Sequence, residues 1–231
     1  MNEIIPKHIV FFLDGNRRWA KEQGLPSLEG HRAGYENVLR LCEWAKARGV
    51  NVLTAYGFST ENWGRSRQEV NYLMTLFEKG LSDKNNMEKF QKDGVRVRII
   101  GQKERLPSSL QKIIQDVETA TQKQDQLFLN LAISYGGRWD IVQAVKKMMS
   151  QGLAAEQIDE STFPAFLSTA GLPEPDLVIR AGGEKRFSNF LLWQSAYAEL
   201  YFSPKYWPDF TEEDFNQALE EFSQRKRRFG H

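Results

Sequence analysis

The chain has 231 residues, 41% of them apolar and 12% aromatic, which suits a globular protein with a sizeable core. Its 31 basic and 30 acidic residues give a net charge of +1, which argues against nucleic acid as a partner. The single cysteine, Cys42, excludes an internal disulfide and a cysteine-based zinc site, and its helical apolar stripe predicts a core position. Because the chain has no secretory signal and no apolar run of roughly 18 residues, we expect a soluble, cytoplasmic protein.

Short apolar runs alternate with longer helical patterns along the chain. Buried strands are predicted at residues 9–13, 52–58, 95–100, 127–133, 177–179 and 199–202. Helices are predicted at residues 34–48, along the apolar stripe from Val70 to Leu81, after Pro107, and from residue 212 to about 227 behind an N-cap at Thr211. This alternation predicts one α/β domain over residues 1–231, with a largely parallel central sheet covered by helices.

Three polar clusters each follow a predicted strand, where ligands bind in sheets of this kind. They are Asp14-Gly15-Asn16-Arg17-Arg18-Trp19, Ser59-Thr60-Glu61-Asn62-Trp63-Gly64-Arg65 and Arg180-Ala181-Gly182-Gly183-Glu184-Lys185-Arg186-Phe187-Ser188-Asn189. An aspartate suits Mg²⁺, and arginines with glycine-rich backbone suit phosphate oxygens. Each cluster alone is also compatible with a solvated loop or a surface ion pair.

Another segment, Gly30-His31-Arg32-Ala33-Gly34, is predicted to open the helix at residues 34–48 and to offer free amides to an anion. The standard phosphate-binding motifs are absent, because no G-x-x-x-x-G-K-[ST] occurs and no two glycines are spaced G-x-G. The aspartate-rich D-D-x-x-D of the all-helical trans-prenyltransferases is also missing. The residues by themselves therefore indicate an arginine-rich anion site at strand ends, without specifying a reaction.

Eight motifs in the same order resemble the cis-prenyltransferase family, and within it the bacterial undecaprenyl diphosphate synthases. They are D-G-N-x-R-W-A from Asp14, G-H-R-A-G from Gly30, F-S-T-E-N-W from Phe58, Y-G-G-R-W-D from Tyr135, D-L-V-I-R from Asp176, S-N-F-L-L-W-Q from Ser188, A-Y-A-E-L-Y-F from Ala196 and W-P-D-F from Trp207. The resemblance extends from His8 to Gly230. Eight such motifs in register are far more specific than any one of them.

The resemblance implies Mg²⁺-dependent cis-condensation of isopentenyl diphosphate onto an allylic primer, farnesyl diphosphate. The expected product is undecaprenyl diphosphate, the precursor of a lipid carrier for cell-wall polysaccharide synthesis. An apolar tunnel for the product, a homodimer and peripheral membrane contact during product release are also implied. Three alternatives are a cis-prenyltransferase of another product length, a noncatalytic lipid-binding partner subunit and a generic phosphatase. A noncatalytic subunit would be expected to lose the Asp14 cluster, which is complete here.

The resemblance also assigns roles to individual residues. Asp14 matches the catalytic, Mg²⁺-binding aspartate, Asn62 the proposed proton acceptor, and Glu199 a further metal-site carboxylate. The matched substrate-binding positions are Gly15, Asn16, Arg17, Arg18, Trp19, Ser27, His31, Ser59, Thr60, Glu61, Trp63, Arg65, Arg180, Arg186, Phe187 and Ser188. The allylic diphosphate is expected at the first cluster, and the isopentenyl diphosphate at the last.

Two positions depart from the family pattern, and two other assignments remain open. Many relatives have arginine where Ser27 stands, and some have histidine, as a proposed metal ligand, where Lys185 stands. Protonated lysine has no lone pair for a metal, so a phosphate contact is expected there. The tail motif, Arg228-Phe229-Gly230, is expected to reach the isopentenyl pocket of a partner subunit. Tunnel lining and ordinary core are equally open for Phe11, Leu13, Leu73, Phe77, Leu129 and Leu131.

Overall fold

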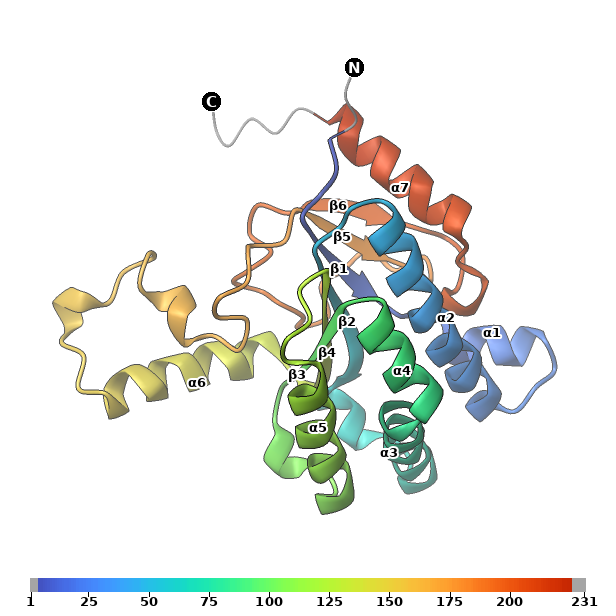
Figure 1. The fold of residues 1–231 in the computed structure, drawn as a ribbon, viewed down its shortest axis with the longest axis horizontal. Helices are drawn as coiled ribbons and strands as arrows, with labels where there is room; N and C mark the ends of the chain where they lie inside the picture. The colour runs from blue at the N-terminus through green and yellow to red at the C-terminus, as the bar shows by residue number, and fades with distance from the viewer. Residues whose placement is uncertain (1–3, 226–231) are drawn as a thin grey trace.

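The computed structural model describes residues 4–225 of the chain. Six strands within this range form one sheet in the order β3-β4-β2-β1-β5-β6, and every hydrogen-bonded neighbour is parallel (Figure 1). The strands are β1 (His8–Phe12), β2 (Val52–Ser59), β3 (Val95–Ile100), β4 (Leu127–Tyr135), β5 (Leu177–Arg180) and β6 (Glu199–Phe202). The predicted parallel α/β sheet is confirmed, and the predicted strands agree closely with the observed ones.

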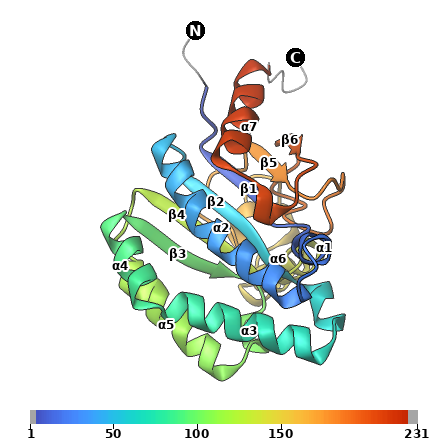
Figure 2. The same cartoon turned by 90° about the vertical axis from the view of Figure 1, so that its right-hand side faces the viewer.

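Helices cover both faces of the sheet, so its central strand is apolar on both sides. Side chains alternate along β1: Ile9 and Phe11 join the larger core, while Val10 and Phe12 join a core on the opposite face. Figure 2 shows α2, α3, α4, α5 and α7 on one side of the sheet, with α6 behind it. The helices are α1 (Asn16–Glu22), α2 (Ser27–Ala47), α3 (Arg67–Ser82), α4 (Lys84–Lys92), α5 (Ser108–Thr121), α6 (Gly137–Ser150) and α7 (Glu212–Gln224). Cys42 is buried in the larger core, as predicted.

The strand order reverses beside β1, which positions the functional site. The chain passes from β1 to β2 on one side, whereas β5 lies on the other side of β1. Loops that leave β1 and β5 therefore diverge and open a crevice beyond the carboxyl ends of these two strands. Phe12 pairs in register with Arg180, so the residues that follow both strands meet at this crevice.

The G-H-R-A-G segment does not open α2, which begins earlier, at Ser27. The prediction of free amides at Gly30–Gly34 is therefore wrong. A side chain at Gly30 would place its Cβ 1.9 Å from the carbonyl oxygen of Asn16, and one at Gly34 would lie 2.5 Å from the Asn16 side chain. These glycines let α1 pack closely against α2, which is a structural reason for their presence.

Three helices were not predicted: α1, α4 and α6. The shortest, α1, has seven residues and buries only Ala20, so it carries no apolar periodicity that a sequence pattern would reveal. The N-cap at Thr211 is confirmed, because its Oγ1 accepts a hydrogen bond from the backbone N–H of Asp214. No helix between residues 4 and 225 is long and apolar enough to cross a bilayer. The Arg228-Phe229-Gly230 motif lies outside the described residues.

Candidate functional site

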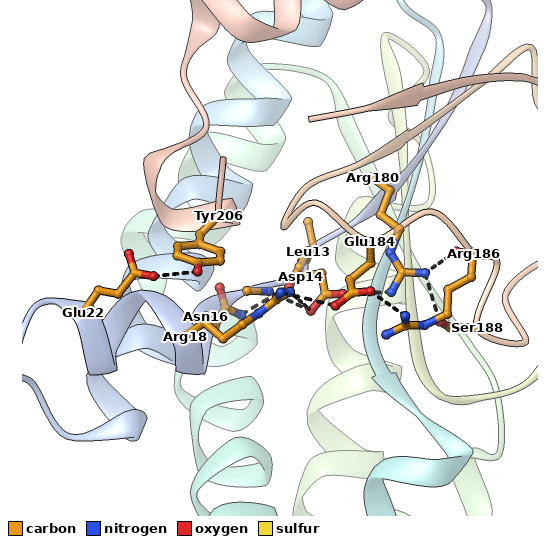
Figure 3. Close-up of polar contacts among 11 residues, drawn as sticks. Leu13, Asp14, Asn16, Arg18, Glu22, Arg180, Glu184, Arg186, Ser188 and Tyr206 are labelled. Carbon is orange, nitrogen blue, oxygen red and sulfur yellow. Dashed lines mark hydrogen bonds and ion pairs between the residues drawn. The ribbon is translucent and has the colours of Figure 1, made fainter. Parts of the chain in front are cut away.

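The loop after β1 is joined to the end of β5 by an ion pair between Asp14 and Arg180. An oxygen of the Asp14 carboxylate, Oδ2, lies 2.8 Å from Nη2 of Arg180 (Figure 3). The other, Oδ1, accepts a hydrogen bond from the backbone N–H of Gly15 at 2.7 Å and lies 3.6 Å from Nη2 of Arg18. One carboxylate thus connects the first and the third of the sequence clusters.

Arg180 is almost fully buried, with its side chain only 4% exposed. Its Nη1 donates to Ser188 Oγ at 2.9 Å and to the carbonyl oxygen of Arg186, and its guanidinium lies 4.7 Å from the centre of the Phe12 ring. Nε of Arg180 is buried without a hydrogen-bond partner, so the cation is incompletely satisfied. A buried cation with an unused donor favours binding of an anion.

The loop that follows β5 contains non-glycine residues in the left-handed region. Ser188 has φ 44° and Asn189 has φ 62°, conformations that cost of the order of 1–3 kcal/mol each. Contacts from other segments maintain them: Asn189 donates to Glu61 Oε1 at 2.8 Å and accepts from the backbone N–H of Arg138 at 2.9 Å. The strain is consistent with a loop shaped to present Arg186 and Ser188 at the crevice.

Glu184 links the two groups of arginines. Its Oε1 lies 3.3 Å from Nη1 of Arg18, and its Oε2 accepts a hydrogen bond from Arg186 (Figure 3). Arg18 also lies 5.2 Å from the centre of the Tyr206 ring. The carboxylates of Asp14 and Glu184 therefore pair with the arginines that would otherwise bind phosphate oxygens.

The glycines of these loops have backbone roles other than the predicted contact between glycine-rich backbone and phosphate oxygens. Gly15 has φ 97°, and a Cβ there would lie 2.5 Å from the Tyr206 ring. Gly182 and Gly183 also have positive φ, but their N–H groups donate to the carbonyl oxygens of Lys205 and Ser203. Because these amides are engaged, the glycine pair does not offer them to an anion, and the arginines remain the anion-binding groups of the loop.

A second ionic cluster surrounds Glu69 at the start of α3. Its Oε1 lies 3.1 Å from Nε2 of His31 and 2.9 Å from Nη1 of Arg65, and its Oε2 lies 3.6 Å from Arg17. Burial lowers the pKa of His31, an effect that the hydrogen bond to Glu69 partly offsets. Glu69 was not singled out from sequence, although Ser66, three residues earlier, is a capping signal that would have placed it at a helix start.

Two adjoining cavities contain most of the predicted site residues. The strand-end cavity, of about 660 Å³, is lined by Phe12, Leu13, Asp14, Asn16, His31, Tyr56, Gly57, Ser59, Glu61, Asn62, Arg65, Leu73, Arg138, Arg180, Arg186, Ser188, Asn189 and Leu192. The α1 cavity, also about 660 Å³, is lined by Leu13, Asp14, Gly15, Asn16, Arg17, Arg18, Lys21, Gly24, Leu25, Pro26, Ser27, His31 and Arg65. Five residues line both, so the two cavities meet at Asp14.

Charge is unequally distributed in these cavities. Four cationic side chains line each cavity. They are Arg65, Arg138, Arg180 and Arg186 in the strand-end cavity, and Arg17, Arg18, Lys21 and Arg65 in the α1 cavity. Asp14 and Glu61 are the carboxylates of the first cavity, and Asp14 is that of the second. The excess of positive charge suits ligands that carry several negative charges, such as diphosphates.

The segment after β2 contributes Ser59, Glu61 and Asn62 to the strand-end cavity. Asn62 Oδ1 accepts a hydrogen bond from the backbone N–H of Ser59 at 3.1 Å and so closes the 3₁₀ turn Thr60–Gly64. The amide oxygen is therefore engaged in holding this turn. Asn62 is better suited to orient a group in the cavity than to act as a free base.

Four other predicted substrate-binding residues do not line these two cavities, and their side chains contact other segments of the protein. Trp19 donates from Nε1 to Asp209 at 2.7 Å, and Trp63 donates to Ser134 Oγ at 2.9 Å. Phe187 packs against the core on the α6 side, and Thr60 lies against Gly136. Their substrate-binding roles stay predictions, and in this structure these side chains support the loops.

The structure does not place Glu199, the second predicted metal-site carboxylate, close to Asp14 of the same chain. It begins β6 and pairs in register with Leu177, three residues before Arg180, so it lies toward the amino end of the parallel strands. Its Oε2 lies 2.9 Å from Nη1 of Arg225. Residue spacing alone did not reveal that Asp14 and Glu199 lie toward opposite ends of the parallel strands.

Asp14 would hold a magnesium ion as its single carboxylate ligand from the protein. No cluster of three or more His, Cys, Asp or Glu side chains suited to a metal occurs in residues 4–225. Mg²⁺ typically takes one or two carboxylates and completes its coordination with substrate phosphate oxygens and water. A single carboxylate beside cationic cavities matches that chemistry, because the substrate would supply the remaining oxygens.

The six candidate tunnel residues divide into three pairs. Leu13 and Leu73 line the strand-end cavity. Phe11 and Leu129 are buried in the larger core, and Phe77 and Leu131 pack partly buried against it. An apolar wall therefore begins at the cavity and continues into the core on the α2 and α3 side of the sheet.

Comparison with known proteins gives a consistent result over nearly the whole chain. Residues 12–230 match the prenyltransferase family model described as undecaprenyl diphosphate synthase. A Legionella pneumophila ditrans,polycis-undecaprenyl-diphosphate synthase, farnesyl-diphosphate specific, is 45% identical, covering 100% of this chain and 98% of the relative. A tomato (2Z,6Z)-farnesyl diphosphate synthase is 47% identical, covering 99% of this chain and 80% of the relative.

The solved structures include a close match. Lavandulyl diphosphate synthase from Lavandula x intermedia, in complex with dimethylallyl diphosphate, superposes with a TM-score of 0.94 at 39% identity. The alignment covers 100% of both chains. Relatives at a similar level of identity thus carry names of products of different length.

Proposed function

Because this chain belongs to the family of undecaprenyl diphosphate synthases and is a cis-prenyltransferase, we propose that it condenses isopentenyl diphosphate onto farnesyl diphosphate with Mg²⁺. The observation that carries the proposal is the ion pair of Asp14 and Arg180, which joins two cationic cavities. A condensation needs two diphosphate substrates held next to each other, and the shared wall at Asp14 supports this arrangement.

The proposal assigns one diphosphate to each group of arginines. The allylic diphosphate would bind in the α1 cavity, at Arg17 and Arg18, and the isopentenyl diphosphate at Arg180, Arg186 and Ser188. Each arginine donates paired N–H groups that match phosphate oxygens. Diphosphate oxygens would replace the Asp14 and Glu184 carboxylates as partners of these guanidinium groups. Preorganised cations then stabilise the negative charge that develops on the leaving diphosphate.

The residues next to the reacting carbons position them and handle the proton. The double bond of isopentenyl diphosphate forms the new bond to the allylic carbon, whose bond to oxygen breaks, and diphosphate leaves with the electron pair. A proton is then lost from the isopentenyl unit. We assign Asn62 to orient that part of the substrate, with diphosphate or water accepting the proton, because its own amide oxygen is engaged by Ser59.

Mg²⁺, held by Asp14 with substrate oxygens and water, would add positive charge at the departing diphosphate. The charge and position of Asp14 support this assignment, since its carboxylate lies between the two arginine groups. Release of Arg180 from Asp14 would let the guanidinium turn to substrate oxygens. Leu13 and Leu73 would receive the hydrocarbon and exclude water from it.

The product and assembly belong to the same proposal. We assign undecaprenyl diphosphate as the product, a cytoplasmic location with peripheral membrane contact for product release, and a homodimer. Arg225 is anchored by Glu199 and by the carbonyl oxygen of Leu200, toward the amino end of β6. Arg225 therefore lies toward the opposite end of the strands from the chain's own Arg180, and we assign the tail to a partner's isopentenyl pocket.

The direct test is incubation of the purified chain with farnesyl diphosphate, labelled isopentenyl diphosphate and Mg²⁺. Extraction and sizing of the labelled polyprenyl product, with matched reactions in EDTA, measure both the activity and its metal requirement. Elongated cis-polyprenyl diphosphate is expected in the presence of Mg²⁺ and none with EDTA. Diphosphate release without chain extension would contradict the proposal, as would extension that EDTA leaves unchanged.

A further inference from the structure

The connection between β6 and α7, residues 203–211, packs against α1, the helix that carries the arginines of the first cluster. The backbone N–H of Trp207 donates to the carbonyl oxygen of Asp14 at 2.9 Å. Trp19 of α1 donates from its Nε1 to Asp209 at 2.7 Å. A helix of seven residues is too short to be stable by itself, so contacts of this kind help to hold α1 in place.

Tyr206 contacts α1 at both of its ends. A Cβ at Gly15, the N-cap of α1, would lie 2.5 Å from Cδ1 of Tyr206, so the ring lies directly against the backbone there. The Tyr206 hydroxyl donates to Oε1 of Glu22, the last residue of α1, at 2.7 Å (Figure 3). The ring is therefore fixed relative to the helix that it covers.

The guanidinium of Arg18 lies over the face of the same ring. Its central carbon is 5.2 Å from the ring centre, within the distance of about 6 Å at which an aromatic face attracts a cation. Arg18 also makes two contacts with carboxylates, at 3.3 Å to Glu184 and at 3.6 Å to Asp14. Arg18 is thus held by one uncharged ring and by two negatively charged groups.

A bound diphosphate would affect these contacts differently. Its oxygens carry the same kind of charge as the carboxylates of Asp14 and Glu184, so they compete with them for the N–H groups of Arg18. The Tyr206 ring takes none of those N–H groups, because it attracts the guanidinium through its face. The N–H donors of a guanidinium point outward in its plane, so an arginine held by a ring keeps them for phosphate oxygens.

We propose that Tyr206 is a positioning residue of the allylic diphosphate site. Its ring keeps Arg18 directed into the α1 cavity when the substrate displaces Asp14 and Glu184. The inference rests on the proposed function and deepens it, because it takes Arg18 to bind the allylic diphosphate. Arg18 lines the α1 cavity and Tyr206 lines neither substrate cavity, so Tyr206 acts through Arg18 rather than by touching the substrate.

Binding of farnesyl diphosphate tests the proposal directly. Titration calorimetry without isopentenyl diphosphate gives its Kd for each protein in the absence of turnover. Tyr206→Leu removes the aromatic face and is expected to raise Kd by about twofold to fivefold, as for loss of a cation–π contact at an exposed site. Tyr206→Phe keeps the face and should bind like wild type. Phe128→Leu is the matched control, because it removes the ring under Arg96 near the amino end of β4, and it should leave Kd unchanged.

The Arg18→Ala variant shows whether the ring acts through Arg18. Once Arg18 is absent, Tyr206→Leu should have no further effect, so the double variant should bind as Arg18→Ala does. The same rise in Kd with and without Arg18 would overturn the proposal, because the ring would then act only by packing on Gly15. An unchanged Kd in Tyr206→Leu would also overturn it. If Tyr206→Leu does not fold, Tyr206→Met fills similar space without an aromatic face and replaces it in both comparisons.

Kinetic measurements and the wild-type titration separate this inference from the proposed function. Tyr206→Leu should raise KM for farnesyl diphosphate by a factor similar to that for Kd and leave KM for isopentenyl diphosphate unchanged. An equal rise in both KM values would indicate a general loss of structure and overturn the positioning role. A wild-type chain that did not bind farnesyl diphosphate would refute the proposed allylic site itself, and this inference with it. Normal binding by both wild type and Tyr206→Leu would refute the role of the ring alone.

Discussion

Asp14 and Arg180, 166 residues apart in sequence, form a 2.8 Å ion pair where the loops after β1 and β5 meet. The pair lies where strand order reverses, so two loops that diverge elsewhere are joined at one point. It also forms the common wall between the cavities assigned to the two diphosphates. Substitutions around this pair therefore give the most direct tests of the site.

Asp14→Asn is expected to fold normally and to lose turnover. The asparagine keeps one oxygen, which can accept from Arg180 or from the backbone N–H of Gly15, and it removes the charge that would hold Mg²⁺. We expect kcat to fall by about a hundredfold to a thousandfold, as when one preorganised charge interaction is lost. Steady-state rates alongside thermal unfolding would check this, and turnover within a few-fold of wild type would refute the assignment.

Arg18→Ala and Arg186→Ala should affect different substrates. Both side chains are substantially exposed and share Glu184 as a partner, so they form a matched pair. Loss of a charged hydrogen bond costs about 1.5–3 kcal/mol, or roughly tenfold to a hundredfold in apparent KM. Arg18→Ala should raise KM for farnesyl diphosphate, and Arg186→Ala that for isopentenyl diphosphate. Equal effects of both variants on one substrate would contradict this division.

Gly30→Ala should destabilise the fold, although alanine normally favours a helix. The added Cβ would lie 1.9 Å from the carbonyl oxygen of Asn16, which would push α1 away from α2. Such overpacking costs about 1–3 kcal/mol, which corresponds to a fall in Tm of about 5 °C. Gly64→Ala, where no atom lies within 4 Å, is the control. A higher Tm for Gly30→Ala, as helix propensity alone would give, would contradict the packing argument.

His8 should make the fold sensitive to acid. Its Nδ1 lies 2.7 Å from the carbonyl oxygen of Pro173 and its Nε2 2.8 Å from Thr54 Oγ1, and burial lowers the pKa of His8 to about 4, partly offset by Pro173 and Asp176. The unfolded chain therefore binds an extra proton between pH 6.5 and about 4, so stability falls as the pH falls through this window. Each pKa unit is worth about 1.4 kcal/mol, so the loss approaches about 3 kcal/mol.

His8→Gln removes this titration while retaining a polar side chain. The free energy of unfolding, measured with urea from pH 7 to pH 4.5, should decline less steeply in the variant than in wild type. His31, whose pKa burial also lowers, is present in both proteins, so the difference between them isolates His8. Parallel pH profiles for the two proteins would show that His8 does not contribute.

The strands and the positions of the polar clusters were predictable from the sequence. A strand buried on both faces needs a continuous apolar run, as in residues 9–12, and a parallel sheet places the residues after each run at the carboxyl ends of the strands. Asp14 and Arg180 follow two such runs, so their presence at the site required no knowledge of contacts. The helix N-cap at Thr211 was equally predictable, because its hydrogen bond involves a residue only three positions later.

Contacts between distant segments decided the rest. Gly30 lies within α2, where its lack of a side chain lets Asn16 pack closely. Glu199 lies toward the amino ends of the strands because β6 runs parallel to β5 and begins opposite Leu177. Glu184 pairs with Arg18 of α1 and with Arg186 of its own loop, and Tyr35 of α2 meets Gly80 of α3 only when these two helices pack together. Apolar periodicity and residue type determine which segments are buried and which loops carry charge. Which side chains then meet depends on how the helices pack on the sheet, and that packing arises only when the whole chain folds.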